Sequence, residues 1–144
     1  MKMRKSNSII LVTFICSIIL ICISCREEII PPDNFAGNIN EPLETNDQNS
    51  YIFILDAKKL NVDYRKEAYF STFNTRISIT IVDYTSGSIR FQIKDNQSYS
   101  RFSYYGNKNV ELYTKLLNGF VPMFVELKTT DFTGKLKIQL RAAY

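Results

Sequence analysis

Histidine is absent from the 144-residue chain, and all three cysteines lie within its first 25 residues. The lack of histidine excludes Ser-His-Asp and Cys-His nucleophilic catalysis, and it removes the usual histidine-containing zinc sites. Because no cysteine follows Cys25, no disulfide can hold together a domain in the rest of the chain. Such a domain must be stabilised by buried apolar side chains, and all nine tyrosines and eight of the ten phenylalanines lie beyond residue 50.

Glycine is also scarce, and the glycines are isolated, so the chain has no glycine-rich loop that could hold a phosphate. Eight acidic residues follow residue 50, mostly at predicted turns or outward positions, and their spacing pairs no two of them for acid–base catalysis. A small carboxylate-dependent hydrolase is therefore the least favoured function. We predict a protein that is not an enzyme and that uses no metal and no cofactor.

The first 24 residues have the composition of a removable export signal. Residues 1–8 carry three basic residues and no acid, and residues 9–23, IILVTFICSIILICI, are uncharged and almost wholly apolar. A basic start followed by a short apolar run is typical of a secretory signal peptide. The alternative is a membrane-spanning anchor, but a helix of this length covers about 22 Å, and the hydrocarbon core is about 30 Å thick.

The sequence CISC at residues 22–25 resembles the lipobox of bacterial lipoproteins, in which a small residue precedes a cysteine. The resemblance implies that Cys25 receives a diacylglycerol thioether, that residues 1–24 are removed, and that the new amino terminus is acylated. Two or more acyl chains hold a protein durably on a membrane, whereas one chain gives only marginal binding. The alternative is a free cysteine buried at the end of a helix.

Residues 25–50 are predicted to be a flexible tether. Residues 26–50 hold three prolines, six acidic residues and one basic residue, with no sustained apolar period. The sequence REE at residues 26–28 resembles the short acidic tag that directs some lipoproteins to the outer leaflet of the outer membrane. The resemblance implies an outer-membrane protein of the cell envelope that is displayed on the surface. The alternative is that these charges only keep the cleaved end in water.

From residue 51 to residue 144, apolar and polar residues alternate in short runs, which is the pattern of half-buried β-strands. Two hairpins are predicted: one around the turn TSGS at residues 85–88 and one around DFTG at residues 131–134. Their inward-facing residues are Ile77, Ile79, Ile81, Ile89, Phe91, Ile93, Val125, Leu127, Leu136, Ile138 and Leu140. Further strands are predicted at residues 51–57, 60–64, 68–73 and 98–105. Residues 109–118 fit either a strand or a helix.

Seven or eight short strands in one domain predict an all-β fold. Turn signals recur every 8–14 residues, which favours two packed antiparallel sheets, a β-sandwich of the immunoglobulin-like or fibronectin-like kind. The alternative is a small eight-stranded β-barrel with a ligand cavity. Both follow from periodicity alone.

Tyr99, Arg101 and Tyr105 are predicted to share one face of a strand, next to a loop rich in asparagine and lysine. Aromatic rings stack on sugar rings, and the neighbouring polar groups can bind sugar hydroxyls. These residues are therefore candidates for ligand binding. The alternative is structural: the tyrosines cover a sheet face or join the core with Phe102 and Tyr104.

A second candidate surface is the outward row of Lys135, Lys137 and Arg141, joined by Lys128. A basic row can attract phosphate-bearing lipids or acidic polysaccharide, but it can also be an ordinary solvated face or guard an edge strand. The envelope address disfavours nucleic acid as a partner. We predict a lipid-anchored envelope protein with a non-catalytic binding or scaffold domain, whose partners are the membrane and a polysaccharide or another envelope protein. A glycan-binding accessory role is the alternative.

Overall fold

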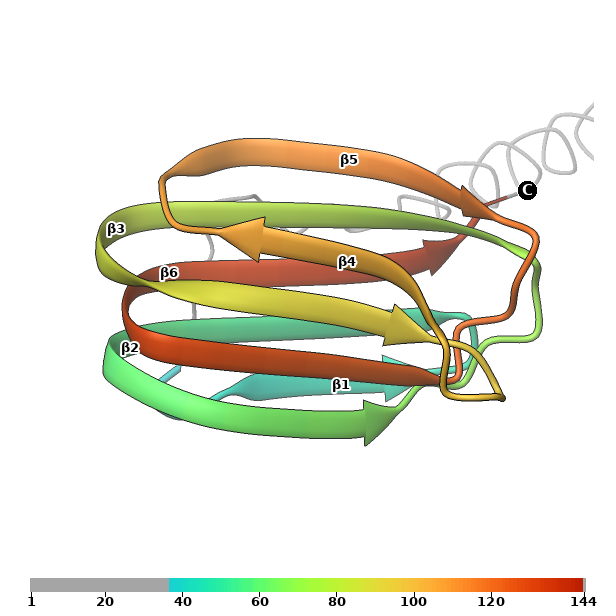
Figure 1. Cartoon of the computed structure of the whole chain (residues 1–144), viewed down its shortest axis with the longest axis horizontal. Helices are drawn as coiled ribbons and strands as arrows, with labels where there is room; N and C mark the ends of the chain where they lie inside the picture. The colour runs from blue at the N-terminus through green and yellow to red at the C-terminus, as the bar shows by residue number, and fades with distance from the viewer. Residues whose placement is uncertain (1–36, 144) are drawn as a thin grey trace, which may run out of the picture. The chain divides into compact units, whose positions relative to one another are not determined.

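A computed structural model describes residues 37–143, which form six β-strands in antiparallel arrangement (Figure 1). The strands are β1 (Leu43–Asp47), β2 (Ser50–Glu67), β3 (Asn74–Lys94), β4 (Ser100–Gly106), β5 (Val110–Asn118) and β6 (Phe124–Ala142). Their order in the sheet is β1-β2-β6-β3-β4, and β5 pairs with β3. The predicted signal peptide and Cys25 lie outside the described residues. Within these residues, no helix has the length and apolar character needed to cross a membrane.

The three long strands β2, β3 and β6 all bend at the same end of the molecule, on the left in Figure 1. The pairing registers shift at this end, between Ala57 and Val62 in β2 and between Val82 and Ser88 in β3. Extra residues at such shifts bend a strand and increase its twist. Because β6 runs between β2 and β3 and pairs with both along their whole lengths, the three strands bend together and the sheet folds over on itself.

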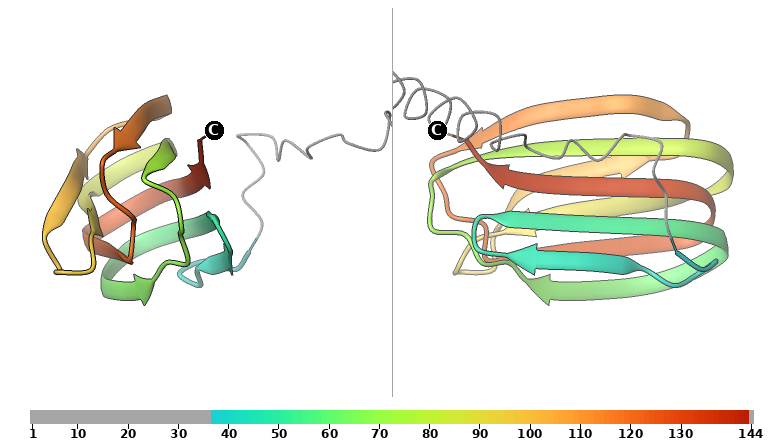
Figure 2. Two further views of the ribbon diagram at one scale, coloured as in Figure 1. Left: turned by 90° about the vertical axis from the view of Figure 1, so that its right-hand side faces the viewer. Right: turned by 180° about the vertical axis from the view of Figure 1, so that it is seen from behind.

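The folded sheet makes two layers (Figure 2). One layer contains β1, β5, the first halves of β2 and β3, and the second half of β6. The other contains β4 and the remaining halves of the three long strands. The predicted all-β antiparallel sandwich is confirmed. The sheet does not close into a barrel, so the barrel alternative is wrong.

The two predicted hairpins are wrong, although their turn positions are real. The runs on either side of TSGS are the two halves of one bent strand, β3, and both halves pair with β6 instead of with each other. The runs on either side of DFTG are likewise the two halves of β6. Turn residues reverse the chain in both arrangements, and only the choice of pairing partner distinguishes a hairpin from a folded sheet.

The core lies between the two layers and contains every inward residue predicted for the long strands. Ile77, Ile79 and Ile81 are fully buried in one layer, and Ile89 and Ile93 in the other. Alternation places one apolar row of each half-strand on the inner face. Because β3 bends between its halves, the rows of its first and second halves face the same interior. Phe132, at the bend of β6, fills the bent end.

Two further predictions are corrected by the structure. Leu43–Asp47, predicted as tether, form β1 and pair with β2. This strand has no inward apolar row, because its half-buried residues are Glu44 and Asn46. Residues 68–73, predicted as a strand, form the connection between β2 and β3. Residues 110–118 are a strand and not a helix.

The polar inner face of β1 closes one side of the sandwich. The Tyr64 hydroxyl donates a hydrogen bond to the Glu44 carboxylate, and the Asn46 side chain donates one to the Glu67 carbonyl at 2.8 Å. Burial raises the pKa of Tyr64, and the neighbouring Glu44 raises it further. The first strand is thus held to both layers, by its ladder with β2 and by side chains that reach the second half of β2.

Candidate binding groove at the loop end

At the end of the sandwich opposite the bends lie the β1–β2 turn and three longer connections, at residues 68–73, 95–99 and 119–123 (Figure 1). Backbone hydrogen bonds join the connections at residues 68–73 and 119–123 to each other, and one bond joins the latter to the end of β3. The Ala68 N–H donates to the Met123 carbonyl at 2.9 Å, and the Met123 N–H donates to the Lys94 carbonyl at 2.9 Å. The Gly119 N–H donates to the Phe73 carbonyl at 3.0 Å. Two of the three connections therefore hold each other in place, and the 119–123 connection is also held to β3 directly before the 95–99 turn.

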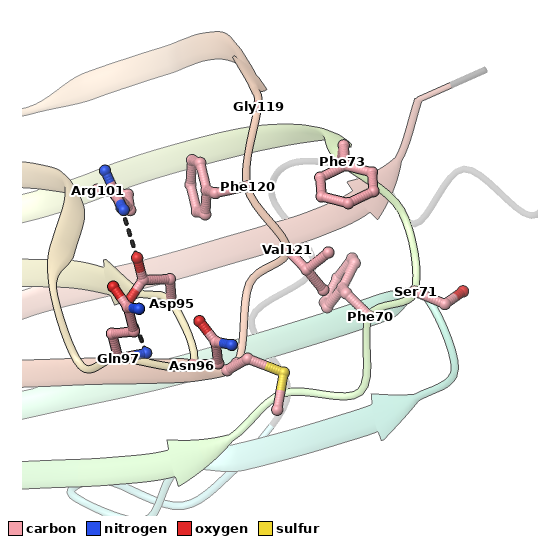
Figure 3. Close-up of a pocket in the computed structure, with 11 residues that line it drawn as sticks. Phe70, Ser71, Phe73, Asp95, Asn96, Gln97, Arg101, Gly119, Phe120 and Val121 are labelled. Atoms are coloured by element: carbon pink, nitrogen blue, oxygen red, sulfur yellow. Dashed lines mark hydrogen bonds and ion pairs between the residues drawn. The ribbon is translucent and has the colours of Figure 1, made fainter.

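These connections enclose a hollow of about 620 Å³, which we call the loop-end groove (Figure 3). This volume is in the range of small-molecule sites, about 300–1,000 Å³. Its apolar lining includes Phe70, Phe73, Phe120, Val121 and Met123, and its polar lining includes Ser71, Asp95, Asn96, Gln97 and Arg101. A second hollow of about 520 Å³ shares Phe70, Ser71 and Met123 with it and continues toward Tyr69.

Large aromatic side chains at this end are exposed to solvent. Phe73 is 64% exposed, Tyr69 is 56% exposed and Tyr99 is 62% exposed. Phe73 lines the loop-end groove, Tyr69 lines the second hollow, and Tyr99 lies next to the groove residue Arg101. Single exposed apolar residues are ordinary on protein surfaces, but a group of them beside hollows is a candidate interaction site. Phe120 and Val121 are partly buried and anchor the groove to the core.

Asp95 and Arg101 form the charged corner of the groove. The Arg101 Nε donates to the Asp95 Oδ2 at 2.6 Å, and the backbone N–H groups of Gln97 and Tyr99 donate to the Asp95 Oδ1 at 2.9 and 3.0 Å. Burial by itself raises the pKa of Asp95, but these three hydrogen bonds outweigh it, so the pKa lies below its ordinary value. The carboxylate stays ionised and holds the 95–99 turn and the arginine in one geometry.

The predicted tyrosine face divides into two parts. Tyr99 and Arg101 lie together, with the Arg101 Cζ 5.8 Å from the centroid of the Tyr99 ring. Tyr105 is 63% exposed on the same strand, but four residues beyond Arg101, or about 13 Å along β4 toward the bent end. Phe102 and Tyr104 point inward and contact Tyr113 of β5. Arg101 thus belongs to the loop-end groove, with Tyr99 beside it, and Tyr105 is separate.

The predicted basic row is also divided, by the bend of β6. Lys128 precedes the bend and lies on the outer face of the second layer, where its side chain is 3.5 Å from the Asp63 carboxylate. Lys135, Lys137 and Arg141 follow the bend and lie on the outer face of the first layer. Lys128 therefore does not join the other three.

The remaining basic residues differ in their surroundings. The Lys135 ammonium is 2.8 Å from the Asp83 carboxylate, and this hydrogen bond raises the pKa of Lys135. Lys137 is buried, with 3% of its surface exposed. Arg141 lies directly opposite Arg76 of β3, so this face carries a fourth basic residue that the prediction from sequence did not include. The basic residues of this face therefore do not form a uniform row that is exposed to solvent.

Most groove residues were missed because they lie in loops. Phe70 and Phe73 were assigned to a strand, and Phe120, Val121 and Met123 surround a proline at the start of the second predicted hairpin. The available signal was the presence of three large apolar residues beside turn residues, where a soluble loop is usually polar. Among residues 37–143, no group of three or more acidic side chains is placed to hold a metal ion.

A scan against protein-family models gives no match to this chain, and a search of curated proteins gives no significant match. The groove must therefore be interpreted from its own geometry.

Proposed function

We propose that the protein is a lipid-anchored protein of the cell envelope whose β-sandwich is a non-catalytic binding module. The apolar segment at residues 9–23 and the lipobox-like CISC support the anchor, and REE at residues 26–28 supports display on the outer membrane surface. The domain supplies the binding function through the loop-end groove.

The observation that carries this proposal is the exposure of aromatic side chains around a hollow held in place by hydrogen bonds. Phe73 lines the loop-end groove and Tyr69 lines the adjoining second hollow, and leaving more than half of each side chain in water loses the stabilisation that burial would give. The single carboxylate in the groove, Asp95, is already occupied by Arg101 and two backbone donors, so it supports binding better than acid–base chemistry.

Glycan binding is the more specific candidate. Tyr99 presents an exposed ring next to a guanidinium, and the groove rim carries the side-chain amides of Asn96 and Gln97. Sugars are bound by aromatic rings that cover their C–H faces and by planar polar groups that hydrogen-bond their hydroxyls.

Phe73→Ala tests the groove, with Tyr105→Ala as the matched control because the two side chains are equally exposed at opposite ends of the domain. The full-length protein in detergent is passed through affinity gels that contain neutral or acidic polysaccharides. Phe73→Ala should lose retention without a change in melting temperature, and Tyr105→Ala should keep it. Equal retention of both variants and the parent would contradict the assignment of the groove.

The anchor is tested separately with Cys25→Ser and its control Cys22→Ser. The thioether requires the sulfur of Cys25, so Cys25→Ser should abolish labelling by an alkyne fatty acid and signal removal. Cys22→Ser should be processed and labelled. Label that persists in Cys25→Ser would refute the anchor site.

A further inference from the structure

We infer that the loop-end groove binds a sugar that carries a carboxylate, and that the Arg101 guanidinium is the group that binds this carboxylate. The inference rests on the proposed function, since it names the ligand class of the same groove. It follows from how Arg101 is held and from what surrounds it.

Arg101 is oriented and yet mostly unsatisfied. Its Nε donates to the Asp95 Oδ2 at 2.6 Å, and no other hydrogen bond or ion pair of its guanidinium occurs within residues 37–143. The Asp95 side chain is 7% exposed and the Arg101 side chain 48% exposed. The buried carboxylate therefore holds the guanidinium through its Nε (Figure 3). The two terminal nitrogens of this groove-lining side chain remain as donors.

Two parallel N–H donors on a fixed planar group match the geometry of a carboxylate. Bidentate pairs of this kind are stronger and more directional than hydrogen bonds between neutral groups. Because Asp95 already orients the arginine, less side-chain entropy is lost when an anion binds. A neutral hydroxyl would use at most part of this donor pair.

The neighbours of Arg101 favour a sugar as the carrier of the carboxylate. The Arg101 Cζ is 5.8 Å from the centroid of the Tyr99 ring. Phe120 and Phe73 form apolar lining of the groove (Figure 3). The side-chain amides of Asn96 and Gln97 make no hydrogen bond within the described part of the chain, so they can serve hydroxyl groups. An acidic sugar uses the anion site, the aromatic faces and the amides together, because it combines a carboxylate, C–H ring faces and several hydroxyls in one small unit.

The competing interpretation is that Arg101 only fastens the 95–99 turn through Asp95. That role would make the loss of Arg101 harmful to stability, and it would affect acidic and neutral ligands alike. The test therefore has to compare ligands that differ only in the carboxylate.

The full-length protein in detergent is run through affinity gels that contain polygalacturonate, alginate or hyaluronate, and through gels with the carboxyl-reduced form of each polymer. We expect retention by at least one acidic polymer and roughly ten- to a hundredfold weaker retention by its reduced form. Arg101→Gln should lose the same factor on the acidic polymer. Arg101→Lys keeps the charge and the pairing with Asp95 but lacks the planar donor pair, so it should weaken retention at an unchanged melting temperature. Arg76→Gln, which removes an exposed arginine on the first layer, is the control.

The alternatives give distinct results. Equal retention by an acidic polymer and its reduced form, lost on Phe73→Ala, would overturn the carboxylate inference while the groove remained a binding site. Arg101-dependent binding of a peptide with a free terminal carboxylate, without binding of any polymer, would overturn the sugar class. Absence of any groove-dependent retention would overturn both this inference and the proposed function.

Discussion

Gly87→Ala should destabilise the domain much more than Gly119→Ala, although the two glycines have nearly the same backbone conformation. Their φ angles are +81° and +83°, in the region that favours glycine. A Cβ at Gly87 would lie 2.3 Å from the carbonyl oxygens of Thr130 and Asp131, at the bend of β6. A Cβ at Gly119 would have no atom within 4 Å. Comparing the two variants therefore separates the cost of an alanine at positive φ from the cost of a steric clash between the bent strands β3 and β6.

The magnitudes follow from these contacts. An alanine in the left-handed region costs about 1–2 kcal/mol, partly offset by about 0.4–1 kcal/mol because the unfolded chain loses freedom. Gly119→Ala should thus cost about 1 kcal/mol. At Gly87 the backbone of β6 must move as well, and overpacking of this kind adds about 1–3 kcal/mol. Gly87→Ala should therefore cost about 2–4 kcal/mol of a total that is typically about 5–15 kcal/mol.

Thermal unfolding of the full-length protein, followed by circular dichroism, measures the difference. For a domain of this size, 1 kcal/mol corresponds to about 4–8 °C. Gly119→Ala should lower the melting temperature by about that amount and Gly87→Ala by two to four times as much. Equal losses for the two variants would refute the close contact between β3 and β6 and, with it, the folded-over sheet.

Three further predictions concern the core and the first strand. Ile79→Asp places a charge in the core and should unfold the domain, whereas Ser78→Asp on the outer face of the same strand should leave cooperative unfolding intact; circular dichroism distinguishes them. A chain that begins at residue 50 lacks β1 and should have a lower urea midpoint than one that begins at residue 37; equal midpoints would contradict the pairing of β1. Burial, and then the hydrogen bond to Glu44, raise the pKa of Tyr64 above its ordinary value near 10. As the pH rises above about 10, the tyrosine therefore ionises in the unfolded chain before it does in the folded one, and the free energy of unfolding decreases. Tyr64→Phe should make the urea midpoint fall less steeply above pH ~10, and an unchanged pH profile would contradict this role.

The strands show which features can be predicted from the local sequence pattern. Ile77, Ile79 and Ile81 were assigned to an inward face from their alternation, and all three are fully buried. Alternation depends on the geometry of one strand and on the need to bury one of its faces, so it does not require knowledge of the partner. The same reasoning failed for β1, because the half-buried residues of that strand are the polar Glu44 and Asn46.

The groove shows a mixed result. Tyr99 and Arg101 were selected from their spacing, and they do lie together at the loop end. Tyr105 was selected with them but is at the far end of the strand, because residues of one face can still be distant along it. Phe73 and Phe120 are far apart in the sequence, and only the hydrogen bonds between their connections bring them to one hollow.

The sequence by itself determined the all-β class, the turn positions and the inward residues of the long strands, because each depends on neighbours within a few residues. The tertiary structure decided the rest: that TSGS and DFTG bend a sheet instead of closing hairpins, that Lys128 and Lys135 face opposite sides, and that Asp95 holds Arg101 at the groove. The physical reason is that hydrogen-bonded strands can satisfy their backbones with several partners. The choice among partners is made by the whole core, when both halves of β2, β3 and β6 bury their apolar rows in one interior.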